Sequence, residues 1–217
     1  MKGHRFNKIL SKAFGLLIWK VVPLNDSILA LELRLEEKLE VEFLVVSLEH
    51  RKISKIKNKK INWWTNIEGG HGDHIQLQQF EHENDPSSKK SLQINWRTNK
   101  LSKTPIKDDE PTPQYFPVFY PKDHEGFIDI SSFLATLSIT HHHAIEYLEY
   151  EYLIIITYYQ GQSNLKRKIL ALDKDGEELL HDQIDSNMKG IVFQSFFTFG
   201  RYLVYVKERR TLEVFYI

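Results

Sequence analysis

Alternating apolar and polar positions dominate the chain. In ILALELRL (28–35), Leu29, Leu31 and Leu33 alternate with Ala30 and polar residues. This two-residue period predicts a strand with one buried face and one face in water. The charged turn 36–38 separates it from EVEFLVVSLE (40–49), so the two segments predict an antiparallel hairpin.

The same pattern of strand, turn and strand recurs along the chain. Residues 28–48, 74–96, 151–172 and 201–217 each predict such a hairpin, and an additional apolar stretch precedes each one. A four-stranded antiparallel unit that recurs roughly every 40–50 residues is typical of a β-propeller blade. We therefore expect an all-β, propeller-like fold with four recognisable antiparallel repeats. The last repeat lacks its fourth strand, which the N-terminal residues are candidates to supply.

Residues 102–143 interrupt the repeats as a loop or insertion within a single domain, 1–217. They contain five of the seven prolines and an acidic run, which favours a surface loop. Within them DISSFLATL (129–137) predicts one short helix, with Asp129 or Ser131 as N-cap and Phe133, Leu134 and Leu137 directed inward. The alternative reading of this segment is a fifth, degenerate repeat.

Composition narrows the classes of function. The 29 basic and 29 acidic residues cancel, which argues against nucleic acid as a partner. The absence of cysteine excludes disulfides, thiolate catalysis and cysteine-bound zinc. The run at 16–19 is too short for a membrane span and predicts a strand, so we expect a cytoplasmic protein.

Three segments together suggest a family: IEYLEYEYLIIITYY, ILALDKDGEEL and GIVFQSFFTFGRYLVYVKERRTLEVFYI. The chain resembles an uncharacterised family of bacterial proteins, a domain of unknown function with propeller-like strand repeats. The resemblance covers most of the chain and is best from Ala144 onward. It implies a propeller-like all-β chain, and it brings no activity, cofactor or catalytic residue.

The stretch INWWTNIEGGHGDHIQLQQFEH (61–82) contains the main candidate site. His71 and His74 stand three positions apart with Asp73 between them, and two imidazoles with a carboxylate can hold zinc or iron. The glycine-rich residues 69–72 predict a turn, so the loop is also readable as a plain connector between two strands. The sequence names no third ligand, and no metal is assigned.

Two adjacent tryptophans, Trp63 and Trp64, begin the same stretch. On a strand they point to opposite faces, so we expect one in the core and the other at the rim of the fold. An exposed tryptophan beside a glycine loop offers a platform for a flat ligand or a peptide. Trp19 and Trp96 are expected to be core residues.

Three other segments have structural explanations that outweigh the functional ones. His141, His142 and His143 alternate between the faces of a strand and cannot all bind one metal. The basic run 51–60 is typical of a protected sheet edge. The turn 173–176 resembles a calcium loop but lacks its full ligand set.

Two functions from different classes remain. No enzyme motif is present, which favours a non-enzymatic interaction or ligand-binding module that uses rim loops and exposed aromatics. Its expected partner is a protein or peptide, and it needs no cofactor. The alternative is a metal-assisted hydrolase or lyase centred on residues 69–74. The sequence specifies no oligomeric state.

Overall fold

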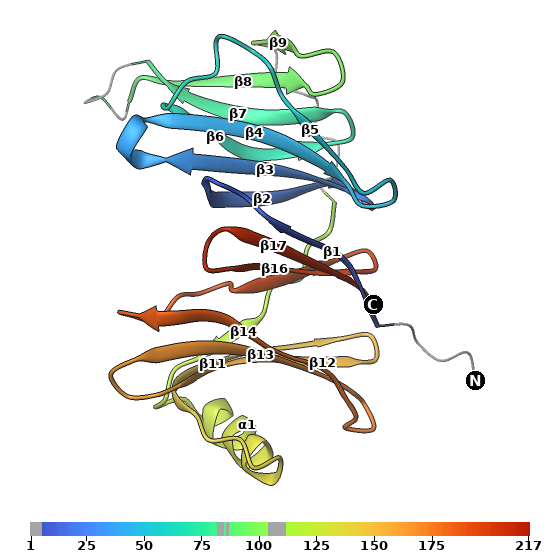
Figure 1. The fold of residues 1–217 in the computed structure, drawn as a ribbon, viewed down its shortest axis with the longest axis vertical. Coiled ribbons are helices and arrows are strands. Elements are labelled where there is room, and N and C mark those ends of the chain that lie inside the picture. The colour runs from blue at the N-terminus through green and yellow to red at the C-terminus, as the bar shows by residue number, and fades with distance from the viewer. Residues whose placement is uncertain (1–5, 82–84, 86, 104–111) are drawn as a thin grey trace.

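The computed structural model describes residues 6–81, 85, 87–103 and 112–217. These residues form strands β1 to β17, one α-helix and one short 3₁₀ helix, and the strands make four antiparallel sheets (Figure 1). The all-β prediction is therefore confirmed. No helix within the described ranges has the length and apolar character that crossing a membrane requires.

Two sheets are built from the N-terminal half of the chain. The β2–β5 sheet contains β2 (Leu17–Asn25), β3 (Ile28–Leu35), β4 (Glu40–Ser47) and β5 (Lys52–Lys55), with the 3₁₀ helix η1 (Glu36–Lys38) between β3 and β4. The β6–β9 sheet contains β6 (Thr65–His71), β7 (His74–Phe80), β8 (Lys89–Asn95) and β9 (Lys100–Ser102). In both sheets the strands lie in chain order.

The other two sheets use the remaining strands. The β10–β14 sheet contains β10 (Val118–Tyr120), β11 (His142–Tyr150), β12 (Leu153–Gln160), β13 (Leu165–Asp173) and β14 (Glu178–Met188). The terminal sheet contains β15 (Phe196–Phe199), β16 (Tyr202–Lys207), β17 (Thr211–Tyr216) and, at its edge, β1 (Asn7–Ala13). The N-terminal strand β1, a candidate for the missing fourth strand, supplies it by pairing with β17 at the edge of the terminal sheet.

The four predicted hairpins are all present. They are β3–β4, β7–β8, β12–β13 and β16–β17, each paired antiparallel. The stretch GIVFQSFF becomes a strand only from Phe196. The alternative of a fifth, degenerate repeat has no sheet of its own, because β10 joins the edge of the β10–β14 sheet by pairing with β11. Residues 104–111, which include two of the five prolines and the acidic run of the predicted loop, lie outside the described residues.

The sheets lie one upon another in an open stack (Figure 1). The β6–β9 sheet is at one end, followed by the β2–β5 sheet, the terminal sheet and, at the other end, the β10–β14 sheet. A cluster of buried apolar side chains fills each of the three interfaces between neighbouring sheets. A sheet inside the stack therefore buries both of its faces.

A helix covers the outer face of the β10–β14 sheet. Helix α1 (Glu125–Thr136) packs Phe127, Ile130 and Leu134 against this face. The predicted helix is confirmed, but it begins earlier than expected because the His124 side chain caps it by accepting a hydrogen bond from the Gly126 amide. Asp129 and Ser131 are therefore not the N-cap. The prediction that Leu137 points inward is also wrong, since Leu137 is 37% exposed.

The outer face of the β6–β9 sheet carries polar side chains instead of a helix. Three cross-strand pairs on this face of β7 and β8 are entirely polar: His74–Asn95, Gln76–Gln93 and Gln78–Ser91. The residues between them, such as Ile75 and Leu77, point to the other face and pack on the β2–β5 sheet. A polar outer face is how a stack of such units commonly ends in water.

Candidate functional site

A cavity of about 900 Å³ lies where residues of all four sheets meet. Its walls come from β2, β6, β15 and β16, from β13 and β14, and from the segments around residues 116 and 194. The lining contains five charged side chains and one imidazole: Lys20, Glu68, Arg167, Asp185, Arg209 and His71. This convergence makes the cavity the main candidate site of the fold.

The mouth of the cavity has an apolar border. Trp19, Phe116 and Val192 line it and are each between 41% and 49% exposed. Beside Val192, the exposed Phe193 stacks edge-on against Phe119 with ring centroids 4.5 Å apart. Large apolar side chains left in water around a cavity are typical of ligand and partner sites.

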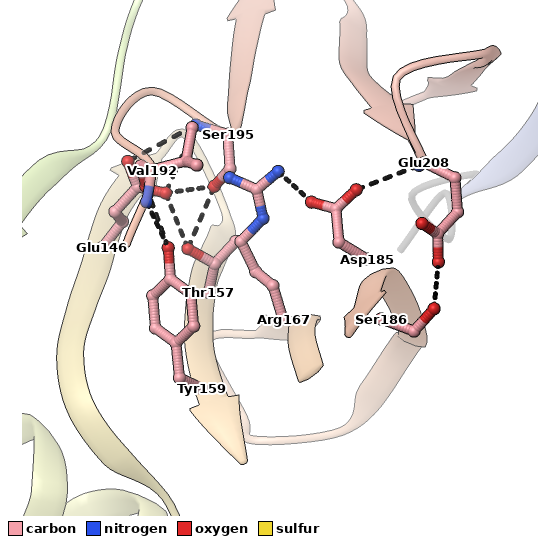
Figure 2. A network of polar contacts seen from close by, with 9 residues as sticks. All are labelled: Glu146, Thr157, Tyr159, Arg167, Asp185, Ser186, Val192, Ser195 and Glu208. Carbon is pink, nitrogen blue, oxygen red and sulfur yellow. Dashed lines mark hydrogen bonds and ion pairs between the residues drawn. The ribbon is translucent and has the colours of Figure 1, made fainter. Parts of the chain in front are cut away.

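A buried polar network fixes one wall of the cavity (Figure 2). The Glu146 carboxylate on β11 accepts hydrogen bonds from Thr157 Oγ1 at 2.8 Å and from the hydroxyl of Ser195. The Tyr159 hydroxyl both accepts from the Val192 amide at 2.9 Å and donates to the Val192 carbonyl at 3.0 Å. Burial raises the pKa of Tyr159, so its proton stays in place. The segment 189–195 is therefore held by two strands of the β10–β14 sheet.

Arg167 stands beside this network on β13 and is only 6% exposed. Its Nη2 donates to Asp185, whose other carboxylate oxygen accepts from the Glu208 amide at 3.0 Å (Figure 2). Its Nε and Nη1 are buried and have no hydrogen-bond partner. The guanidinium is close enough to Tyr159 to lower the pKa of that phenol, although less than burial raises it. A buried unpaired donor costs about 1–3 kcal/mol, so Arg167 is incompletely satisfied.

The other buried arginine among the described residues has a partner for each of its three nitrogens. Arg34 on β3 is 5% exposed and donates through Nε to Glu32 at 2.6 Å. Its Nη1 donates to the Trp63 carbonyl at 2.7 Å, and its Nη2 donates to the Thr65 carbonyl at 2.8 Å and to Asn66 Oδ1 at 2.7 Å. This arginine joins the β2–β5 sheet to the β6–β9 sheet and has a structural role.

The glycine-rich stretch forms a strand and a tight turn. Strand β6 runs to His71, and only Gly72 and Asp73 connect it to β7, so the expected loop is two residues long. Gly72 has a φ of +56°, which suits glycine. At Gly70 a Cβ would lie 2.3 Å from Leu24 Cδ2 and 2.7 Å from the His74 carbonyl oxygen. Gly70 thus lets β6 approach β2 closely.

The three candidate metal ligands have different surroundings. His71 lines the cavity, and its buried Nδ1 has no partner. Asp73 accepts a hydrogen bond from Arg97 Nε at 2.7 Å, and His74 Nε2 lies 3.3 Å from the Asn95 side-chain amide. In the described part of the chain, no group of three or more His, Asp or Glu residues is placed to hold a metal ion.

The tryptophans differ from expectation. Trp63 and Trp64 form a turn before β6 rather than a strand, and both are half-buried. The Arg34 guanidinium lies 4.6 Å from the Trp63 ring. Trp19, expected in the core, is 49% exposed on the cavity wall, and Arg209 lies 5.3 Å from its ring. The exposed tryptophan of this region is therefore Trp19.

The remaining segments have structural roles in the fold. The basic run supplies β5, which is an edge strand, and Lys55 pairs with Glu42 at 2.5 Å. The Ser131 hydroxyl and His141 Nε2 share a hydrogen bond of 2.8 Å. Burial lowers the pKa of His141. Residues 173–176 form the turn between β13 and β14, where Gly176 has a φ of +86°.

A second, smaller cavity of about 350 Å³ lies beside α1. In its wall the Tyr158 hydroxyl lies 2.6 Å from His181 Nε2, and His181 Nδ1 lies 3.4 Å from Glu178. Burial raises the pKa of Tyr158 to about 12, so the phenol keeps its proton. The row of three polar groups was not expected from the sequence.

Comparison with known proteins adds a family match for part of the chain. Residues 23–102 match a domain of unknown function (DUF4905). The match spans most of the β2–β5 sheet and the whole β6–β9 sheet, whereas the resemblance was expected to be best from Ala144 onward. No curated protein matches the chain. The similarity supports an uncharacterised family and assigns no activity.

Proposed function

We propose that the protein is a non-enzymatic ligand-binding module whose ligand occupies the cavity between the four sheets. The observation that carries this proposal is the convergence of all four sheets on one cavity with an exposed aromatic border at Trp19 and Phe116. In this proposal residues 1–217 act as one domain, and the propeller-like repeats serve to position the rim segments. A small molecule or the side chain of a protein or peptide partner would fill the space.

Removal of the rim aromatics tests this proposal. We expect a thermal-shift panel of organic acids, sugars, nucleosides and amino acids to raise the melting temperature of the unmodified protein with at least one compound class. Trp19→Ala and Phe116→Ala should weaken that binding by about tenfold or more, since each removes a large contact. The control is Ile128→Ala, because Ile128 is 62% exposed on α1 and does not line the cavity. Binding that Trp19→Ala and Phe116→Ala leave unchanged would contradict the proposal.

The metal-assisted hydrolase or lyase centred on residues 69–74 remains the second candidate. One observation favours it: His71 and His74 are directly paired across the β6–β7 hairpin, so their side chains leave the same face. The unpartnered Nδ1 of His71 is available as a ligand atom. Against it, the Asp73 carboxylate is engaged by Arg97.

The double variant His71→Ala, His74→Ala separates the two candidates. For a binding module we expect the free energy of unfolding to change by about 1 kcal/mol or less, as substitutions outside the core usually do. A chelator should then leave the melting temperature of the unmodified protein unaltered. If a chelator lowers that temperature, and the double variant abolishes the effect, the residues hold a metal and the second candidate replaces the first.

A further inference from the structure

We infer that the cavity binds an organic monocarboxylate with an apolar body, and that Arg167 holds its carboxylate. This inference rests on the proposed function and specifies the class of ligand. It begins from the buried Nε and Nη1 of Arg167, which donate no hydrogen bond, on a side chain that lines the cavity. A guanidinium presents its N–H groups in the planar geometry that matches a carboxylate.

Arg34 provides the internal comparison. Each nitrogen of its guanidinium donates a hydrogen bond, to Glu32, to backbone carbonyls or to Asn66. The fold therefore gives every nitrogen of a buried arginine a partner where the arginine has a structural role. Arg167 is equally buried, but Asp185 engages only its Nη2. The unused donors of Arg167 indicate a partner from outside the chain.

Asp185 positions Arg167 for such a partner. Its carboxylate is anchored on the opposite side by the Glu208 amide, so it holds one nitrogen of the guanidinium in place. Nε and Nη1 have no exposed surface in this structure, although the Arg167 side chain lines the cavity. A rotation of the guanidinium about its contact with Asp185 would turn them toward a ligand in the cavity, whose oxygens would supply the missing hydrogen bonds.

The net charge of the cavity lining favours a ligand with a single negative charge. The cations are Lys20, Arg167 and Arg209, and the carboxylates are Glu68 and Asp185. The lining therefore has a small excess of positive charge, which a monocarboxylate neutralises and a phosphate dianion exceeds. Glu146, buried next to Ser195, further disfavours a dianion at this wall.

The apolar border defines the rest of the ligand. Ile18, Phe197 and Val204 line the cavity among its buried residues, and Trp19 and Phe116 line it at the exposed edge. These side chains have no hydrogen-bonding role toward a sugar or a nucleoside except through the indole of Trp19. A ligand with an aliphatic or aromatic group of modest size would bury these apolar side chains. Ligand pockets commonly combine apolar walls with a few convergent polar groups.

Isothermal titration calorimetry with matched acids and amides tests the inference. The probes are phenylacetate and hexanoate, their neutral counterparts phenylacetamide and hexanamide, and inorganic phosphate. In the unmodified protein we expect each acid to bind about tenfold or more tightly than its amide. In Arg167→Gln that preference should fall below about threefold, and Arg167→Lys, which keeps the charge beside Asp185, should lose part of it.

Arg97→Gln is the matched control, because it removes the charge of an exposed arginine that does not line the cavity. It should keep most of the preference for the acid. The acid–amide comparison in the unmodified protein decides the matter even where an Arg167 variant fails to fold. Equal binding of acid and amide would overturn the inference and leave the proposed function standing. The same conclusion would follow if none of these probes binds while a compound of the thermal-shift panel does. Tight, Arg167-dependent binding of inorganic phosphate would overturn it in favour of a phosphate ligand.

Discussion

Replacing Arg34 with methionine is expected to lower the free energy of unfolding by about 3–5 kcal/mol. The substitution keeps an unbranched apolar stem but removes every hydrogen bond that joins β3 to the segment 63–66. It also leaves the Glu32 carboxylate buried without its cation, although the Ile67 amide still donates to it at 2.7 Å. Urea unfolding monitored by circular dichroism would give the free energy of unfolding and its denaturant dependence.

Arg97→Met is the control for this experiment. Arg97 also pairs with a carboxylate, Asp73, and its guanidinium also lies over a tryptophan, 4.4 Å from the Trp96 ring. Its side chain is 58% exposed, so water screens the pair and its loss should cost about 1 kcal/mol or less. Equal losses in the two variants would mean that burial does not decide the contribution of the Arg34 network.

The β3 strand shows how far the sequence pattern leads. The two-residue period of ILALELRL correctly predicts a strand and its hairpin with β4. It also predicts that the face with Glu32 and Arg34 is in water, which is wrong, since both residues are buried. The face is covered by the β6–β9 sheet, whose contacts with Arg34 come from about thirty positions further along the chain. A local pattern contains no information about that neighbour.

The candidate site could be predicted only in part. His71 was selected because of its local motif, and it does line the cavity. Arg167 was missed because LKRKIL reads as a strand with a charged outer face. A signal was present, since Arg167 stands two positions from Leu165 and two from Ile169, in phase with residues that are buried. A cation at an inward position of an apolar strand is therefore a better indicator of a site than a run of charges.

The apolar character of both faces of β12 also had an explanation that the sequence did not reveal. One face packs on the terminal sheet through Leu153 and Ile155, as stacking of repeats predicts. The other face, with Ile156 and Tyr158, is covered by helix α1 instead of by another repeat. The helix itself was predictable from its apolar residues. Its partner surface was not, because the helix and β12 are separated by β11 along the chain.

Replacing Leu134 with alanine is expected to lower the free energy of unfolding by about 2–5 kcal/mol. Leu134 is fully buried in the cluster that joins α1 to Ile156, Tyr158 and Leu172, so its removal leaves a cavity at the covered end of the stack. Leu137→Ala is the control with the same chemical change, three positions further on. Leu137 is 37% exposed at the end of the helix, and its truncation should cost about 1 kcal/mol or less.

Unfolding of the two variants in guanidinium chloride gives the free energy of unfolding that each one loses. The sequence placed both leucines inward, and the structure distinguishes them, so the difference between the two losses measures how much α1 contributes by covering the β10–β14 sheet. A fluorescent dye for exposed apolar surface should bind Leu134→Ala more strongly than Leu137→Ala, because loosening the helix uncovers Ile156 and its neighbours. Losses of the same size would show that the sheet keeps its outer face stable without the helix, and the helix would then not be what ends the stack.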